Sequence, residues 1–151
     1  MQTKLYAAYG SNMNLSQMKK RCPKARVVGK GDLLGYKLTF RGTQSGVANV
    51  EVINNGKVPV VLWAITNECE KSLDRYEGFP TLYTKKLIEV ETPVGTEKVM
   101  VYVMTRQYES KPALPNEYYF ATISQGYQDN GIDIAFLQEA LERCKAELEI
   151  K

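Results

Sequence analysis

The chain has 151 residues, which suits one ordinary domain with its own hydrophobic core, and we treat residues 1–151 as a single domain. Its composition, 44% hydrophobic and 25% charged, is not that of a disordered chain, and no apolar run approaches the ~20 residues of a membrane helix. A net charge of +3 with scattered Lys and Arg gives no reason to expect a nucleic-acid partner.

Histidine and cysteine limit the chemistry open to the chain. The sequence has no histidine, which excludes Ser-His and Cys-His nucleophile pairs and every His-based zinc site. Cys22, Cys69 and Cys144 lack C-x-x-C spacing, and residues 1–6 lack a signal-peptide pattern, so we expect reduced thiols in a cytoplasmic protein without a membrane partner. Acid–base chemistry near neutral pH must then use a perturbed carboxylate, Lys, Tyr or Cys.

The first half of the chain is rich in strand patterns. A short buried strand at 5–9 leads into a helix that Asn14 and Gln17 open as a capping box. Asn55-Gly56 between apolar runs predicts a hairpin turn. The strands expected after this helix are 26–28, 33–40, 46–53 and 58–65.

The second half adds helices without a regular alternation of strand and helix. Asn67 is expected to cap a helix at 67–76 that ends at Gly78. Strands are expected at 82–91 and 98–104, and helices at 116–127 and 133–148. The apolar stripe of the last helix suits core packing or the contact of a homodimer. This order predicts an α+β fold with a closed or strongly bent, mostly antiparallel sheet.

The loop between the first strand and the first helix is a candidate anion site. Gly10 permits a backbone turn that a side chain would block, and successive N–H groups from Tyr9 to Asn12 form a cradle for a carboxylate. Ser11 adds a hydroxyl to the same loop. The alternative is a plain strand-to-helix turn with a polar cap.

Glu77 is a candidate proton carrier. It falls at the C-terminal end of the predicted helix 67–76, where the helix dipole disfavours a carboxylate and raises its pKa. A dehydrating wall around it is expected from Tyr76, Phe79, Pro80, Leu82 and Tyr83. The alternative is an exposed Glu beside the glycine that ends the helix.

A third segment begins a helix after Pro115. Core packing explains Ile123 and Gly126 well. Tyr119 is different, because a buried tyrosine hydroxyl must find a hydrogen-bond partner.

Taken in order, the three segments resemble the γ-glutamylcyclotransferase-like family over residues 5–131. The family's strand is followed by a Tyr-Gly-Ser-Asn loop, which is found here at 9–12. A Leu-Asp-x-x-Glu-Gly segment with a later Tyr, and a Pro-Ser-x-x-Tyr-x-x-x-Ile-x-x-Gly pattern, complete the resemblance. They match Leu73, Asp74, Glu77, Gly78 and Tyr83, and then Pro115, Tyr119, Ile123 and Gly126. Asn116 stands where the family has Ser.

The resemblance implies a small, mostly antiparallel or mixed β-barrel flanked by helices. It implies a cyclotransferase that converts a small-molecule γ-glutamyl amine or γ-glutamyl amino acid to 5-oxoproline without a metal or other cofactor. Glu77 would be the catalytic acid and base. The residues expected to bind substrate are Tyr9, Gly10, Ser11, Asn12 and Tyr119.

Two other functions remain open at this point. The same barrel could hold a carboxylate metabolite without chemistry, or the helix at 133–148 could serve as a docking surface. The leaving group also stays open, although the segment from Glu77 to Pro80 with Tyr83 is more similar to the γ-glutamylamine branch of the family.

Overall fold

The computed structural model describes residues 2–109 and 111–149 of the chain. The described residues form a closed barrel with the strand order β1-β3-β2-β4-β5. The strands are β1 (Lys4–Ala8), β2 (Arg26–Arg41), β3 (Val47–Ile65), β4 (Tyr83–Thr92) and β5 (Gly95–Met104). Neighbours run antiparallel, except that β1 and β5 pair in parallel. The expected α+β class, with a mostly antiparallel, mixed β-barrel, is confirmed.

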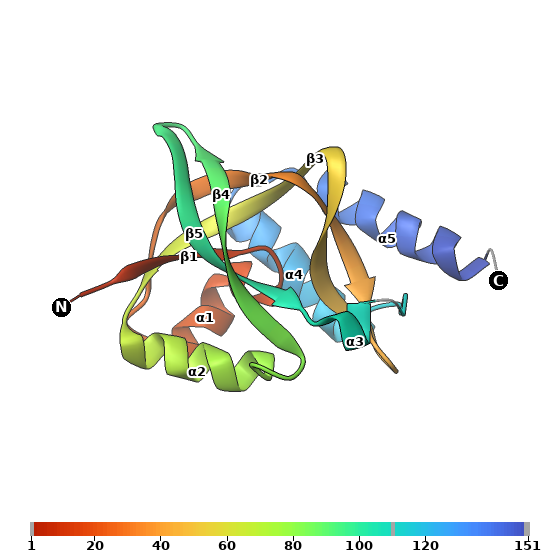
Figure 1. The fold of residues 1–151 in the computed structure, drawn as a ribbon, viewed down its shortest axis with the longest axis horizontal. Helices are drawn as coiled ribbons and strands as arrows, with labels where there is room; N and C mark the ends of the chain where they lie inside the picture. Colours follow the sequence, from red (N-terminus) through yellow and green to blue (C-terminus); the bar gives the residue numbers. More distant parts are fainter. Residues whose placement is uncertain (1, 110, 150–151) are drawn as a thin grey trace.

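Helices flank the barrel, as expected (Figure 1). Helices α1 and α2 contact each other on one side of it, α4 packs on the short helix η1, and α5 extends toward the C-terminus. The helical elements are η1 (Ser11–Met13), α1 (Leu15–Arg21), α2 (Asn67–Glu77), α3 (Arg106–Glu109), α4 (Glu117–Asp129) and α5 (Ala135–Glu149). The one-turn helix α3 lies between β5 and α4.

Strand β3 corrects a prediction. Asn55-Gly56 does not form a hairpin turn, because β3 continues through it. The pairing of β3 with β2 shifts register near Gly35, and both Gly35 (φ 84°) and Asn55 (φ 61°) adopt left-handed backbone conformations. The residues that permit a tight turn also permit a bulge, and here they bend a long two-stranded ribbon. The chain reverses instead between Arg41 and Val47, where β2 ends and β3 begins.

Side-chain caps define where the helices begin. Asn14 caps α1, as predicted, and Asn116 caps α4; each side-chain oxygen accepts the backbone N–H three residues on. For α2 the prediction was one residue late, because Thr66 rather than Asn67 supplies the capping oxygen. Gly78 ends α2 in the left-handed conformation with φ 69°, as its position predicted.

Helix α5 packs on β2 of its own chain. Leu137, Ala140 and Cys144 on one face of α5 are buried, and Arg143 Nη2 donates to the carbonyl of Leu38 at 2.9 Å. The buried face of α5 is therefore used for packing within the chain.

The core fills the barrel and the space under the helices. Every residue from 58 to 65 in β3 is buried, so both faces of that strand are covered. All three cysteines are free and buried, as expected from their spacing. Within residues 2–109 and 111–149, no helix is both long and apolar enough to cross a membrane.

Candidate functional site

The structure brings all the predicted site residues together around one cavity of about 230 Å³. The cavity lies where the end of β1, the loop into η1, the end of α2, the start of β4 and α4 meet. The predicted residues that line it are Tyr9, Gly10, Ser11, Asn12, Glu77 and Tyr119. Segments 110 residues apart in sequence thus supply one small site.

Helix α4 holds the loop at 10–14 in place. Gly126 lies so close to the loop that a Cβ there would come within 2.8 Å of the backbone of Met13 and Asn14. Asn130 Nδ2 donates to the carbonyl of Met13 at 2.8 Å, and Asn14 Nδ2 donates to the carbonyl of Thr122 at 3.0 Å. Gly126, in the third sequence motif, therefore has a packing role, as the sequence analysis expected.

The loop presents donors to the cavity. Met13 N and Asn14 N donate to the carbonyls of Gly10 and Ser11, which forms the turn of η1. Within the described part of the chain, the backbone N–H groups of Ser11 and Asn12 donate to no backbone carbonyl. A Cβ on Gly10 would come within 3.2 Å of the Ala48 side chain, so Gly10 allows the loop to pack closely against the start of β3. The N–H groups of Ser11 and Asn12 are candidate donors to a small anion.

Glu77 is the last residue of α2, and its carboxyl faces the cavity. Burial raises the pKa of this carboxyl to about 7, and the positive charge of Arg21 opposes part of that rise. The raised pKa was predicted, but burial rather than the helix dipole is its main physical cause. The Glu77 Oε2 atom accepts a hydrogen bond from Asn12 Nδ2 at 3.3 Å.

Six of the residues that line the cavity are tyrosines. Beside Tyr9 and Tyr119, the lining tyrosines are Tyr6, Tyr76, Tyr83 and Tyr102. Burial raises the pKa of Tyr6, Tyr9, Tyr83, Tyr102 and Tyr119, so these five hydroxyls keep their protons at any ordinary pH. These five side chains are therefore uncharged.

Several of these hydroxyls brace the site. Tyr9 donates to the carbonyl of Tyr102 at 2.7 Å, and Tyr83 donates to the carbonyl of Ala48. The Tyr119 hydroxyl accepts the N–H of Ala48 at 2.9 Å, which gives this buried group the partner that it needs. Because that bond uses an oxygen lone pair, the Tyr119 proton stays available for a ligand.

The wall predicted around Glu77 is only partly correct. Tyr76, Leu82 and Tyr83 do line the cavity, whereas Phe79 and Pro80 do not. The ring of Phe79 packs instead under the ammonium group of a lysine on β4, with 4.2 Å between the nitrogen and the ring centroid.

Three residues near Glu77 were missed by the sequence analysis. Tyr6 and Tyr102 reach the cavity because β1 and β5 lie side by side in the barrel, and that pairing has no local sequence signal. Arg21 reaches the back of the site from the end of α1, where its Nη1 donates to Asn12 Oδ1 at 2.6 Å. From the sequence alone, an arginine in the last turn of a helix is expected to be exposed and to interact favourably with the helix dipole. The position of Arg21 therefore gave no signal of a role in the site.

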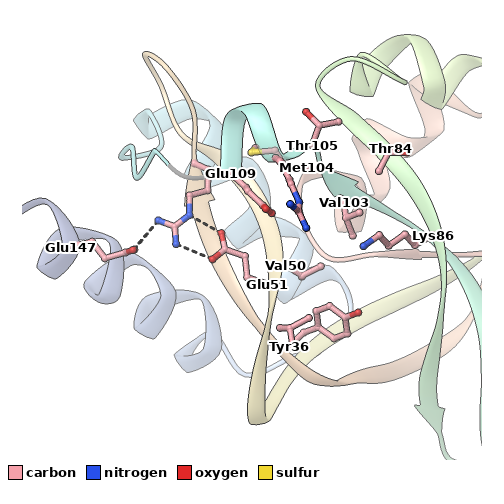
Figure 2. Close-up of a pocket in the computed structure, with 13 residues that line it drawn as sticks. Tyr36, Val50, Glu51, Thr84, Lys86, Val103, Met104, Thr105, Glu109 and Glu147 are labelled. Atoms are coloured by element: carbon pink, nitrogen blue, oxygen red, sulfur yellow. Dashed lines mark hydrogen bonds and ion pairs between the residues drawn. The ribbon is translucent and has the colours of Figure 1, made fainter.

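A larger hollow of about 770 Å³ lies elsewhere, between β3, the β4–β5 pair, α3 and α5 (Figure 2). Two of the acidic side chains on its wall are engaged, since Arg41 forms ion pairs with Glu51 and Glu147. Lys86 and Arg106 on its wall are exposed, so solvent screens their charges. The smaller cavity, with a buried carboxyl whose pKa lies near 7, is the better candidate for chemistry.

Comparisons with known proteins agree on one family. Residues 6–121 match the family model described as "Gamma-glutamyl cyclotransferase, AIG2-like". The chain is 30% identical to the mouse protein named gamma-glutamylcyclotransferase, over 96% of this chain and 79% of that protein. It is 29% identical to the human protein of the same name, over 91% of this chain and 77% of that one. A solved structure named gamma-glutamyl cyclotransferase superposes with a TM-score of 0.80 at 30% identity, over 96% of this chain and 88% of that one.

Proposed function

Because the chain belongs to the gamma-glutamyl cyclotransferase, AIG2-like family, we propose that it closes the γ-glutamyl group of a small substrate into 5-oxoproline and releases an amine. Glu77 is the proposed acid and base. The family defines the class of reaction, and the geometry of the cavity supports the roles of individual residues.

One observation carries the assignment of Glu77. Among the described residues that line the cavity, Glu77 alone has a carboxyl group, and its pKa lies at about 7. A group with a pKa near the working pH can both accept and return a proton efficiently. The tyrosines around it stay neutral and cannot replace it as a base.

The proposed reaction is intramolecular. Glu77 takes a proton from the α-ammonium group of the substrate, and the free amine attacks the γ-carbonyl carbon. The new carbon–nitrogen bond closes a five-membered ring, and the bond to the departing nitrogen breaks as Glu77 returns its proton to that nitrogen. The ring nitrogen then gives its second proton to the Glu77 carboxylate, which passes it to the released amine, so that Glu77 ends as a carboxylate and the amine leaves as an ammonium ion.

Binding contributes by folding the substrate into a reactive conformation. The N–H groups of Ser11 and Asn12 can hold the α-carboxylate or the developing oxyanion, and the Tyr119 hydroxyl can donate to either. Holding the α-amine near the γ-carbonyl keeps the flexible substrate in a near-attack conformer. This can lower the activation free energy by about 7 kcal/mol or more.

The leaving group is proposed to be an amine rather than an amino acid joined at its α-nitrogen. No lysine or arginine occurs among the described residues that line the cavity. The cavity wall therefore offers no cation to bind the α-carboxylate of an amino-acid leaving group beside the scissile bond. Val47 and Leu82 contribute apolar surface instead. γ-Glutamyl-ε-lysine should therefore turn over faster than γ-glutamyl-alanine; a preference for the dipeptide would reverse this assignment.

The deciding experiment follows 5-oxoproline by mass spectrometry with a panel of γ-glutamyl amines, γ-glutamyl dipeptides and glutathione. We expect Glu77→Gln to keep the fold and to lower kcat by about 10²-fold or more, because general acid–base catalysis contributes about 10²–10⁴. Glu68→Gln is the matched control, since Glu68 is exposed at the other end of the same helix. Each step uses the chain and the substrate alone, so turnover should survive treatment with a chelator.

A carboxylate-binding protein without catalysis is the rival function. A site made only to bind a carboxylate gains nothing from placing Glu77 beside it, because like charges repel. Tight binding of 5-oxoproline with no turnover of any γ-glutamyl compound would favour the rival.

A further inference from the structure

Arg21 is held more firmly than an ordinary arginine at the end of a helix. Its Nη1 donates to Asn12 Oδ1 at 2.6 Å, and its Nη2 donates to Gln17 Oε1 at 2.8 Å. Its guanidinium carbon also lies 3.6 Å from the ring centroid of Tyr76 on α2. The guanidinium plane is therefore fixed from three directions, at the point where α1 meets α2.

This contact determines which way the Asn12 side chain points. A guanidinium group carries only donors, so it can bind only the oxygen end of the amide. The NH₂ end must then face the other way, and Asn12 Nδ2 donates to the Tyr6 hydroxyl at 2.9 Å and to Glu77 Oε2 at 3.3 Å. A reversed amide would place its oxygen against the carboxyl oxygen of Glu77.

We propose that Arg21 is a positioning residue that acts through Asn12 to hold the Glu77 carboxyl in the orientation and charge state needed to accept a proton. This inference rests on the proposed function for its effect on turnover. The arrangement of the three side chains stands on its own and can be tested in the protein without substrate.

The charges around Glu77 support the inference. Burial raises the pKa of its carboxyl, and the positive charge of Arg21 lowers it. The other titratable groups that face Glu77 come from the surrounding elements and are neutral, because their pKa values are raised. They are Tyr6 from β1, Tyr9 directly after β1, Tyr83 from β4, Tyr102 from β5 and Tyr119 from α4. Among the described residues, Arg21 is thus the cation that balances this carboxyl.

A purely structural role for Arg21 makes a different prediction. If Arg21 only braces α1 against Tyr76, its loss lowers stability and reduces turnover equally at every pH. If it acts on Glu77, its loss changes the pH at which the carboxyl ionises.

The first measurement needs no turnover. Infrared difference spectra between the wild type and Glu77→Gln isolate the carboxyl band of Glu77, and a pH series gives its titration midpoint. We expect Arg21→Met to raise that midpoint by about one pH unit, since a nearby opposite charge typically shifts a carboxyl by about one to three units. Lys20→Met removes the same charge from an exposed neighbour on α1 and should leave the midpoint unchanged.

The second measurement is the pH profile of kcat/KM. In Arg21→Met the acid limb should move upward with the midpoint, so that the loss is about 10-fold near pH 6 and becomes several-fold smaller near pH 9. Arg21→Lys should shift in the same direction by a smaller amount, because an ammonium group keeps the charge but cannot hold Asn12 and Gln17 in one plane. Arg21→Lys also carries the test alone if Arg21→Met does not fold.

The outcomes separate the inference from the proposed function. An unchanged infrared midpoint in both Arg21 variants overturns the inference, whatever the turnover. A shifted midpoint supports the inference even if no γ-glutamyl compound is turned over. In that case only the proposed function is rejected. A shifted midpoint together with a shifted acid limb supports both.

Discussion

At the scale of single residues, the burial of the Glu77 carboxyl links catalysis to stability. Burial disfavours the charged form, so the carboxyl holds its proton more tightly in the folded chain than in the unfolded chain. The free energy of unfolding contributed by this group therefore falls as the pH rises from its ordinary pKa of 4.5 to the folded value of about 7. Above about pH 7 the carboxyl is charged in the native state, and the loss of stability from its burial is complete.

Glu77→Gln should remove this penalty. At about pH 8 we expect the variant to unfold with a free energy about 1–3 kcal/mol higher than the wild type, since each pKa unit corresponds to about 1.4 kcal/mol. At about pH 4, where the wild-type carboxyl is protonated in both states, the difference should nearly vanish. Urea unfolding at the two pH values measures it, with Glu68→Gln as control. A difference that does not depend on pH would contradict the buried, protonated carboxyl.

The sequence predicts which residues line the cavity where one segment carries both the residue and its context. Glu77 ends an amphipathic helix and precedes a glycine, and the loop at 9–12 follows a strand, so both could be placed without the fold. Tyr102 and Arg21 could not, because their positions depend on which strands pair and on where one helix end meets another. Those are long-range contacts with no local pattern.

At the scale of elements, α2 carries Glu77 and is fixed along its length. Lys85 of β4 forms ion pairs with Glu70 and Asp74. The Tyr102 hydroxyl of β5 donates to Asp74 Oδ1 at 2.6 Å. These contacts tie α2 to both β4 and β5, so the last turn of the helix presents its carboxyl to the cavity in one orientation.

Gly78→Ala tests how strictly the end of α2 is set. Gly78 adopts the left-handed conformation, and an added Cβ would lie 3.3 Å from Leu82 Cβ. We expect the free energy of unfolding to fall by about 1–2 kcal/mol, because a side chain in this conformation is strained by about that amount. Urea unfolding at neutral pH measures the loss.

Gly29→Ala is the matched control for the backbone effect. Gly29 lies in β2 without a positive φ, and a Cβ there meets no atom within 4 Å. Its replacement should change the free energy of unfolding by less than about 0.5 kcal/mol. Equal losses in the two variants would show that the left-handed conformation at the end of α2 is not the source of the cost.

Element types were easier to predict than the connections between strands. The caps and the apolar runs are local signals, so the helices at α1, α2, α4 and α5 and all the strand regions of the described chain were anticipated. The two strands expected at 26–28 and 33–40 form the single strand β2 in the structure. The two expected at 46–53 and 58–65 likewise form the single strand β3. A glycine or asparagine marks a departure from regular structure, but only the partner strand decides between a turn and a bulge.

At the scale of the whole molecule, Arg41 joins the β2–β3 ribbon to the C-terminal helix. Its guanidinium group is almost fully buried and donates to Glu51 on β3, at 2.7 and 3.0 Å, and to Glu147 on α5, at 2.9 Å. Arg41 itself ends β2. The β2–β3 ribbon and the C-terminal helix are therefore held together by one buried cation.

Arg41→Met should lower the free energy of unfolding by about 3 kcal/mol at neutral pH, because removing one partner of a buried pair leaves the other charge without compensation. Glu147→Gln should have an effect of about 1 kcal/mol or less, since the Glu147 side chain is 40% exposed. Lys145→Met, which breaks the exposed pair with Glu142, is the control and should be nearly neutral. Urea unfolding ranks the three variants.

The pH dependence of the Arg41→Met effect tests its electrostatic origin. Burial alone would raise the pKa of Glu51, but hydrogen bonds from Arg41 and Thr39 outweigh it and hold that pKa below its ordinary value. A depressed pKa stabilises the native state above the unfolded-state pKa, and this stability is lost as the pH falls through the folded value. The difference between wild type and Arg41→Met should therefore be full at pH 7 and shrink below about pH 4. A difference that stays constant into acid would mean that Arg41 contributes through the packing of its aliphatic stem rather than through its charge.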